Sequence, residues 1–339
     1  MPKISGIEYA ISSDDLFFIK ELPKKVLIVG GGYIGLECAS YLIHLGSKVI
    51  LTTRNEFMNK FDLQISDKLK FYLKNSGLIF YDNTSILSIK KEGAKLFVNT
   101  NPSFKNSEVS DFEEGFDIIL FAISREINSK SLNLHKAFKG EVKTTPDGRI
   151  IGGFNGETER IWKNVYAIGD CLDGVPQLTP IAIRSGRLIS EQLAERLANS
   201  DRKMAPIDYN IFPSTMFTVP EYAFVGLSEQ QANIAYGQNN VICFHRESSV
   251  LERSLGNKPQ KAYFKIVCLR GNGNKILGMH YIGPNAGEII QGYYFAMTQG
   301  LTKTMLDQGF GIHPTTAEDF IEMDKLSTNP DASKVGCCN

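Results

Sequence analysis

The sequence lacks a long apolar run, an export signal and an excess of charge of either sign. No stretch of about 18 uninterrupted apolar residues occurs, and the opening MPKISGIEYAISSDD has neither a basic nor an apolar leader region. We therefore expect no membrane partner and a cytoplasmic location, with the mitochondrion as the alternative. The 37 basic residues balance the 37 acidic ones, which argues against nucleic acid as a partner and favours small molecules or proteins.

Cysteine is also scarce. Six cysteines in 339 residues are too few for a disulfide scaffold. Four of them stand singly among apolar neighbours and are expected to be buried thiols: Cys38, Cys171, Cys243 and Cys268. The other two, Cys337 and Cys338, are adjacent and lie just before the last residue.

This adjacent pair favours redox chemistry. A disulfide between neighbouring cysteines closes a strained ring, and strained, exposed disulfides exchange readily. A chain end can also move between an internal electron donor and an external protein. Two incidental thiols are the alternative. A metal site is not predicted, because no histidine or further cysteine lies near enough in the sequence to complete the ligands.

The first half of the sequence contains the pattern of a strand, a tight turn and a helix. Residues 24–29 form a short apolar run that ends at a triple glycine, and apolar residues recur at helical spacing from 33 to 45. A second apolar strand follows at 49–52, so the whole has the length of a βαβ unit. A further helix is expected over 64–75, and a strand over 165–170. From residue 206 onward, strands at 261–268 and 275–282 mixed with helices predict an α+β domain.

The turn satisfies the dinucleotide-binding pattern G-x-G-x-x-G through Gly30, Gly32 and Gly35, with Tyr33 and Ile34 inside it. Because the turn follows a strand and opens a helix, the glycines would allow close backbone approach and the pyrophosphate would rest on the helix N-terminus. A glycine-rich turn without a ligand is the alternative.

The residue that selects the nucleotide is expected at the end of the second strand, where NAD-binding proteins carry a carboxylate. This sequence has Thr53 and Arg54 there, and arginine donates paired hydrogen bonds to a 2′-phosphate. Lys60 would add a second positive charge. The pattern therefore predicts NADPH rather than NADH, with solvated surface charges as the alternative for both basic residues.

Five segments carry a resemblance to a known family: GGGYIGLE (30–37), YAIGD (166–170), LTPIAIRSGR (178–187), GIHPTTAE (311–318) and GCCN (336–339). Together, and in this order, they resemble the pyridine nucleotide-disulfide oxidoreductases, and within them the large, animal-type thioredoxin reductases. The resemblance implies an α/β fold with an NADPH-binding Rossmann-like domain, a partial FAD-binding domain and a C-terminal α+β dimerisation domain.

The same resemblance divides the chain into segments. They are a linker from a missing FAD domain (1–23), the NADPH-binding domain (24–145), the remainder of the FAD-binding domain (146–205), the dimer-interface domain (206–327) and a flexible redox tail (328–339). The family begins with an FAD-binding Rossmann unit and a Cys-x-x-x-x-Cys pair beside the flavin. Nothing before residue 24 resembles either of them.

Roles for individual residues of the nucleotide half also follow from the resemblance. Tyr33 would cover the flavin until nicotinamide displaces it, and Glu37 would help to position the nicotinamide. Arg125 would contact the cofactor. It ends the segment 122–125, where this sequence has serine in place of the family's glycine, and serine takes a positive φ less easily.

In the later segments, Asp170 would hydrogen-bond the ribityl chain of FAD, and Leu178 and Thr179 would contact FAD. His313, oriented by Glu318, would be the acid and base, and it would act in the active site of the partner subunit, which implies a homodimer. The alternatives are a turn cap for Asp170 and a structural histidine for His313.

These expectations predict an NADPH-dependent flavoprotein disulfide reductase, in which electrons pass from NADPH through FAD to the Cys337–Cys338 pair and then to the disulfide of thioredoxin. Glutathione reductase, which generally lacks the tail pair, and thioredoxin-glutathione reductase are alternatives within the fold. A non-catalytic short isoform or fragment that binds NADPH and dimerises is the alternative of another class. For the chain by itself, we expect poor flavin retention and poor solubility, because most FAD contacts would be lost and apolar surface exposed.

Overall fold

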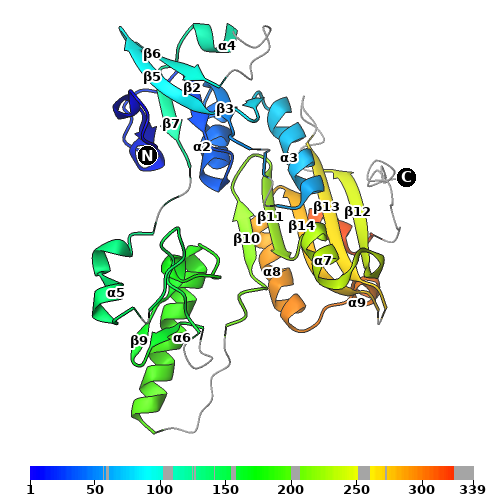
Figure 1. Cartoon of the computed structure of the whole chain (residues 1–339). Helices are drawn as coiled ribbons and strands as arrows, with labels where there is room; N and C mark the ends of the chain where they lie inside the picture. The colour runs from blue at the N-terminus through cyan, green and yellow to red at the C-terminus, as the bar shows by residue number, and fades with distance from the viewer. Residues whose placement is uncertain are drawn as a thin grey trace. The chain divides into compact units, whose positions relative to one another are not determined.

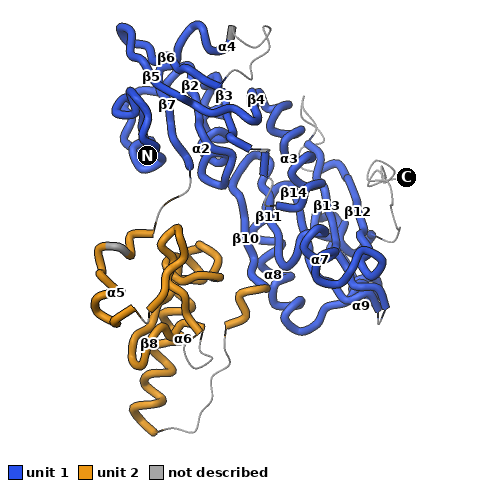
Figure 2. The backbone as a smooth tube through the Cα atoms, in the orientation of Figure 1, with its two compact units in different colours: residues 1–123, 211–339 blue, residues 124–210 orange. Residues whose placement is uncertain are grey.

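The structure is a computed structural model. It describes residues 1–55, 57–58, 61–101, 110–123, 125, 127–140, 142–153, 158–199, 207–250, 260–271 and 273–323. The chain forms two compact units, one made of residues 1–123 with 211–339 and the other of residues 124–210 (Figure 2). In the part that the structure describes, no helix is both long and apolar enough to cross a membrane.

The first sheet of unit 1 has five parallel strands in the order β1-β7-β2-β3-β4 (Figure 1). Its strands are β1 (Ile11–Ser12), β2 (Lys25–Val29), β3 (Lys48–Thr52), β4 (Ile79–Tyr81) and β7 (Ile118–Phe121). The central strands are continuous apolar runs, because both faces of a parallel sheet are covered. Helices α2 (Tyr33–His44) and α3 (Leu63–Asn75) bury their apolar faces with one side of β2 and β3. The predicted strand, turn, helix and second strand are thereby confirmed.

The other face of this sheet is covered by a hairpin of β5 (Ile86–Glu92) and β6 (Lys95–Thr100). Its apolar side chains Ile89 and Leu96 pack with Leu27, Ile50 and Phe116 in one buried cluster. A short helix, α4 (Ser110–Glu113), precedes β7.

The N-terminal segment, expected to be a linker, contains packed elements. They are a 3₁₀ turn η1 (Ile7–Tyr9), strand β1 and helix α1 (Ser13–Leu16). Ile11 pairs with Leu120 in a parallel register, which adds β1 to the edge of the sheet. The Ser12 amide donates to the Asp15 carboxylate at 2.8 Å, which is the capping-box bond at the start of α1. Elements this short show no periodicity, so the sequence pattern did not reveal them.

The second sheet of unit 1 is antiparallel, in the order β10-β11-β14-β13-β12. Its strands are β10 (Pro213–Met216), β11 (Glu221–Gly226), β12 (Val241–Ser249), β13 (Lys261–Leu269) and β14 (Lys275–Gly283). The helical segments around it are α7 (Glu229–Tyr236), η5 (Gln238–Asn240), α8 (Ala286–Thr298), α9 (Lys303–Asp307) and η7 (Thr316–Phe320). Ile290 and Met297 of α8 pack against Val225 and Met279 of the sheet, as the predicted α+β pattern requires.

Unit 2 is smaller and contains a two-stranded antiparallel sheet and one long helix. Its elements are η2 (Lys130–Leu132), α5 (Leu134–Ala137), β8 (Arg160–Trp162), β9 (Val165–Tyr166), η4 (Gly169–Cys171) and α6 (Thr179–Leu197). The strand expected at 165–170 ends at Tyr166, because Gly169 takes a left-handed φ of 66° and turns the chain into η4. Apolar side chains remain exposed on α6, with Leu197 at 87% and Ile183 at 50%.

Unit 2 begins earlier than the domain boundary expected near residue 146, because residues 124–145 belong to it. The Ser129 hydroxyl donates to the Gly148 carbonyl at 2.6 Å. Thr144 also forms a bridge with Ile150. These contacts join the two sides of the expected boundary, and no local sequence signal marks them.

Candidate functional site

The glycine-rich turn leaves β2 at the carboxyl edge of the parallel sheet. Gly30 has a φ of 125°, and a Cβ atom there would lie 2.4 Å from the Ala122 carbonyl oxygen. A Cβ at Gly35 would lie 2.0 Å from the Gly30 carbonyl oxygen, so glycine lets α2 approach β2. Both positions therefore need glycine for the fold itself.

Gly32 differs from these two glycines. Its φ of −86° suits any residue, and nothing lies within 4 Å of the position that a Cβ would occupy. Gly32 is also the N-cap of α2, where no side chain caps the helix. Open space in front of uncapped helix amides fits a pyrophosphate group, which binds best at such a helix end. Ile34, in the first turn of α2, is 37% exposed beside it.

Arg54 follows β3 at the same carboxyl edge of the parallel sheet. Val29 pairs with Thr52 in the parallel register, so the residues that follow β2 and β3 are neighbours. The Arg54 side chain is exposed, whereas the preceding Thr53 is buried and donates its hydroxyl to Asp82 at 3.1 Å. The arrangement suits recognition of a phosphate on the adenosine ribose. Lys60, the second predicted cation, lies outside the described residues.

Tyr33 is held by the antiparallel half of unit 1. Its hydroxyl shares a hydrogen bond of 2.6 Å with the Ser214 hydroxyl on β10. Its ring meets the Phe61 ring edge-on at 5.3 Å. Burial raises the pKa of Tyr33 to about 12, the hydrogen bond from Ser214 opposes this rise, and the charge of Glu37 adds to it. Nothing in the sequence pointed to Ser214, 181 residues away.

Glu37 and Ser40 continue the same face of α2. The Glu37 carboxylate accepts from the Phe217 amide at 2.8 Å, and the Ser40 hydroxyl accepts from the Val219 amide at 2.9 Å. Burial raises the pKa of Glu37, against the opposing hydrogen bond from Phe217. Because Tyr33, Glu37 and Ser40 share one helix face, α2 is fixed to β10 and to the segment that joins β10 and β11.

His313 and Glu318 form the dyad that the sequence predicted. The two carboxylate oxygens of Glu318 lie 3.1 and 3.2 Å from His313 Nδ1. Glu318 is buried and also accepts from the Thr315 amide at 3.2 Å, so its position is fixed. A histidine that donates from Nδ1 presents Nε2 for proton transfer, and the His313 side chain is 66% exposed. A Cβ at Gly311 would lie 2.8 Å from Glu318 Cβ, so glycine allows this close turn.

The expected flavin contacts of unit 2 lie at one end of α6. A Cβ at Gly169 would lie 2.9 Å from the Ala182 Cβ, so the turn that carries Asp170 packs against the first turns of the helix. Asp170 is exposed. Leu178 is the N-cap of α6 and makes no side-chain hydrogen bond there, and Thr179 is the first helical residue. An exposed carboxylate beside an uncapped helix start fits a ligand with hydroxyl and phosphate groups.

Arg125, the remaining predicted cofactor contact, is exposed and belongs to unit 2. The glycine-rich turn belongs to unit 1. Ser124, the departure from the family's pattern beside it, lies outside the described residues.

The single cysteines agree with the expectation only in part. Cys38 and Cys268 are buried, whereas Cys171 and Cys243 are half-buried. Cys243 lies on β12, the edge strand of its sheet, so neighbours cover it incompletely. Burial raises the pKa of Cys243 and of Cys268 to about 12, which keeps both thiols protonated and unreactive.

Two further predictions concern the remaining cysteines and metal binding. The predicted redox pair, Cys337 and Cys338, lies outside the described residues. Among the described residues, no group of three or more histidine, cysteine, aspartate or glutamate side chains is placed to hold a metal ion.

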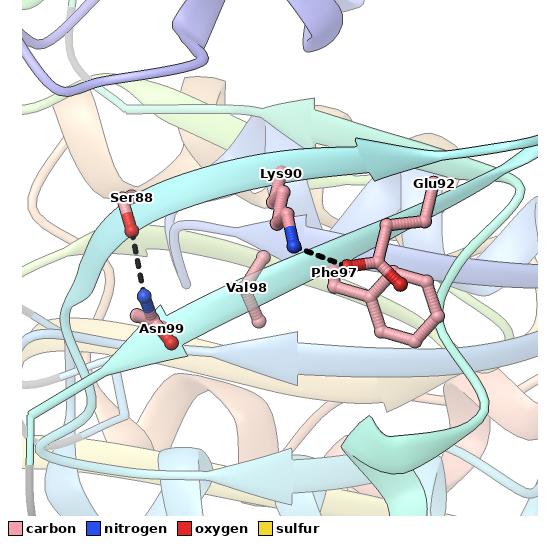
Figure 3. A pocket seen from close by; sticks show the side chains of 6 residues that line it. All are labelled: Ser88, Lys90, Glu92, Phe97, Val98 and Asn99. Carbon is pink, nitrogen blue, oxygen red and sulfur yellow. Dashed lines mark hydrogen bonds and ion pairs between the residues drawn. The ribbon is translucent and has the colours of Figure 1, made fainter.

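A hollow on the β5–β6 hairpin contains none of the predicted site residues (Figure 3). Its polar groups bind one another: Lys90 pairs with Glu92 at 2.6 Å, and the Asn99 amide donates to the Ser88 hydroxyl at 3.0 Å. We assign it no ligand.

The glycine-rich turn at the carboxyl edge of a parallel sheet is typical of Rossmann-like nucleotide-binding folds, and the antiparallel half of unit 1 adds a histidine–carboxylate dyad after α9. Comparison of the sequence with protein families identifies the particular family. Residues 2–186 match the family described as pyridine nucleotide-disulphide oxidoreductase, and residues 212–324 match its dimerisation domain. The chain belongs to the pyridine nucleotide-disulphide oxidoreductase family.

Similar curated proteins carry the name thioredoxin reductase. The chain is 33% identical to thioredoxin reductase SEP1 of Emiliania huxleyi over 99% of this chain and 67% of the relative. It is 36% identical to the mitochondrial thioredoxin reductase 2 of Drosophila melanogaster over 100% of this chain and 63% of the relative. It is 33% identical to a thioredoxin reductase of Plasmodium falciparum over 93% of this chain and 58% of the relative. The chain thus spans about two thirds or less of the length of these relatives.

The fold also resembles that of a solved flavoprotein disulfide reductase. A Cu(II) complex of a mutant of the HOCl-induced reductase RclA from Escherichia coli superposes with a TM-score of 0.79. The sequences are 22% identical, and the match covers 95% of this chain and 69% of that chain. The flavoprotein disulfide reductase fold inferred from the sequence is confirmed.

Proposed function

We propose that this chain is part of an NADPH-dependent flavoprotein disulfide reductase that acts as a homodimer and reduces the disulfide of thioredoxin. The names of the similar curated proteins support the reaction, and the matched dimerisation domain supports the assembly. We keep the cytoplasm as the proposed compartment, with the mitochondrion, named for the Drosophila relative, as the alternative.

The domain assignment is part of the proposal. Residues 24–123 carry the nucleotide, residues 124–205 contribute to the flavin site, residues 206–327 form the dimer interface, and residues 328–339 are the redox tail. The change from the expected boundary at 145 follows the compact units of the structure.

The observation that carries the nucleotide proposal is the open space at Gly32. Gly30 and Gly35 are required by the fold, whereas glycine at 32 is explained by a ligand that approaches the backbone. Arg54, exposed at the same edge of the sheet, would bind a 2′-phosphate and thereby select NADPH. Tyr33 and Glu37 follow on α2, and we assign them to the nicotinamide end.

The residues of unit 2 fit part of an FAD site. Asp170 would accept hydrogen bonds from the ribityl hydroxyls, and Leu178, Thr179 and Arg125 would contact the cofactor. When bound, FAD would supply two-electron transfer between NADPH and a disulfide. The part of unit 2 that the structure describes contains a two-stranded sheet beside its turns and helices, so we expect the site to be incomplete in this chain alone.

The dyad would handle the protons of thiol–disulfide exchange. A thiolate attacks a disulfide sulfur, one S–S bond forms while another breaks, and the departing thiolate takes up a proton. His313 Nε2 would deliver that proton and later remove one, while Glu318 holds the ring through Nδ1. Cys337 and Cys338 would be the exchanging pair.

One titration tests the proposal on the chain as it exists. The purified chain is titrated anaerobically with NADPH and with NADH, while nucleotide binding is followed by calorimetry and flavin by visible absorption. The proposal expects binding that favours NADPH, and a flavin band that bleaches on NADPH in any fraction that retains FAD. A chain that binds neither nucleotide refutes it. A colourless chain that binds NADPH supports the nucleotide site, and in that case reductase activity belongs to the longer protein.

A further inference from the structure

A buried charge cluster joins the parallel sheet domain of unit 1 to its antiparallel half. The Lys265 side chain on β13 and the Asp62 side chain before α3 are both 0% exposed. Lys265 Nζ donates to the two Asp62 oxygens at 2.8 and 2.9 Å and to Glu229 at 2.7 Å. Asp62 and Lys265 are 203 residues apart in the sequence, so the contact is a purely tertiary one.

Asp62 lies at the start of two helices. As the N-cap of α3 it accepts from the Ile65 amide at 3.2 Å. It also accepts from the Glu229 amide, the first residue of α7, at 2.9 Å. Two helix N-termini and one ammonium group therefore converge on a single carboxylate, and both helix dipoles favour its negative charge. Removal of Lys265 would leave this carboxylate buried with only the amides to hold it.

The cluster of Lys265, Asp62 and Glu229 fixes one end of the segment that contains Arg54, the residue proposed to select the nucleotide. In the connection from β3 to α3, Thr53 comes first, Arg54 is exposed to solvent and Asp62 comes last, while residues 56, 59 and 60 lie outside the described residues. At its start, the Thr53 amide donates to the Tyr81 carbonyl at 3.0 Å. At its end, Asp62 is fixed by Lys265 and by the two helix starts. The position of Arg54 is therefore set between an anchor in the parallel sheet and an anchor in the antiparallel half.

The Lys265–Asp62 pair is also linked to Tyr33, another predicted nucleotide contact. Phe61, next to Asp62, meets the Tyr33 ring edge-on at 5.3 Å and the Phe224 ring at 6.2 Å. Figure 1 shows α3 beside the antiparallel sheet, where it contacts β14. A shift at Asp62 would thus be transmitted to the segment that ends there and to the aromatic contact with Tyr33.

We propose that Lys265 is a positioning residue of the nucleotide site. It fixes Asp62, and the neighbouring Phe61 amide, which donates to the Met58 carbonyl at 3.0 Å, extends this anchor toward Arg54, so that Arg54 is held where a 2′-phosphate binds. Replacement of a buried ion pair by apolar residues of similar volume is often neutral or stabilising in proteins, which favours a geometric role for this pair. The inference rests on the proposed NADPH site, because without that site there is no preference to maintain.

The test compares Lys265→Met with Lys303→Met. Lys303 is a matched control: it is 2% exposed, pairs with Asp307 of its own helix, and lies over the Phe244 ring at 5.0 Å. Calorimetric dissociation constants for NADPH and NADH are measured for each variant of the full chain. We expect Lys265→Met to lower the NADPH-to-NADH preference about tenfold through loss of the arginine–phosphate contact. Lys303→Met should leave the preference within about twofold of the wild type.

A structural role alone would weaken both nucleotides by the same factor, so equal weakening by Lys265→Met, or an unchanged preference, overturns the proposal. If Lys265→Met does not fold, the double variant Asp62→Asn, Lys265→Met takes its place, and the same ratio of NADPH and NADH dissociation constants is measured. Asparagine keeps the cap of α3, and the Glu229 carboxylate, which loses Lys265, is 36% exposed, so no charge is left both buried and unpaired. A wild-type chain that binds both nucleotides equally refutes the proposed NADPH site, and this result needs no variant to be recognised.

Discussion

Replacement of Gly32 by alanine separates ligand binding from folding at the glycine-rich turn. The φ of −86° at Gly32 is ordinary for alanine, and nothing lies within 4 Å of the added methyl group. The folded state therefore gains no clash, and the smaller entropy of the unfolded chain, worth about 0.4–1 kcal/mol, offsets the poorer N-cap preference of alanine. The free energy of unfolding, measured by urea titration, should rise slightly or stay unchanged.

Nucleotide binding should respond in the opposite way. The methyl group would occupy the space in which a pyrophosphate oxygen meets the helix amides, whose hydrogen bonds need a separation of about 2.7–3.2 Å. The loss of one charge-assisted hydrogen bond, worth about 1.5–3 kcal/mol, raises Kd for NADPH by roughly 10- to 150-fold. Calorimetry of NADPH binding measures this change.

Two other glycines provide the controls. Gly292 in α8 also has open space around its Cβ position, so Gly292→Ala should stabilise the chain by a similar amount and leave NADPH binding unchanged. Gly35→Ala should destabilise the chain by about 1–3 kcal/mol, because its Cβ would lie 2.0 Å from the Gly30 carbonyl oxygen. Wild-type NADPH affinity in Gly32→Ala would refute the assignment of the open space to the nucleotide.

Three further predictions concern other contacts of unit 1. Ser214→Ala should lower the free energy of unfolding by about 0.5–1.5 kcal/mol, because the 2.6 Å hydrogen bond is lost. In that background, Tyr33→Phe should lower it little further. Additive effects of the two substitutions in a double-mutant cycle, measured by urea unfolding, would contradict the bond. Burial lowers the pKa of His245 from 6.5 to about 4, so stability is full above pH 6.5 and falls as pH drops toward 4. Between pH 7 and 4, His245→Gln should remove up to roughly 3 kcal/mol of the loss in unfolding free energy. If the pH dependence of urea unfolding is the same in this variant as in the wild type, the prediction is wrong. Glu318→Gln should release the fixed tautomer of His313, 3.1 Å away, and ¹⁵N NMR shifts identical to those of the wild-type ring would contradict this.

The sequence by itself determined the local elements of the nucleotide half. The apolar run at 24–29, the glycines that follow it and the helical spacing from 33 predicted β2, the turn and α2, because each depends on residues close in the chain. The predicted helix at 64–75 and the strands at 261–268 and 275–282 are likewise present as α3, β13 and β14. The roles assigned to Arg54, Asp170 and the Cys337–Cys338 pair stay predictions.

Only the tertiary structure decided which distant residues meet. Ser214 reaches Tyr33 across 181 positions, and Lys265 reaches Asp62 across 203. Neither residue belongs to a periodic pattern or a motif, and a buried lysine on a strand has no signature in the sequence of that strand. Partner choice in such contacts is set by the packing of one sheet against another, which depends on the whole chain. For this reason the sequence predicted the nucleotide-binding turn, whereas the contacts that hold its surroundings in place emerged only from the fold.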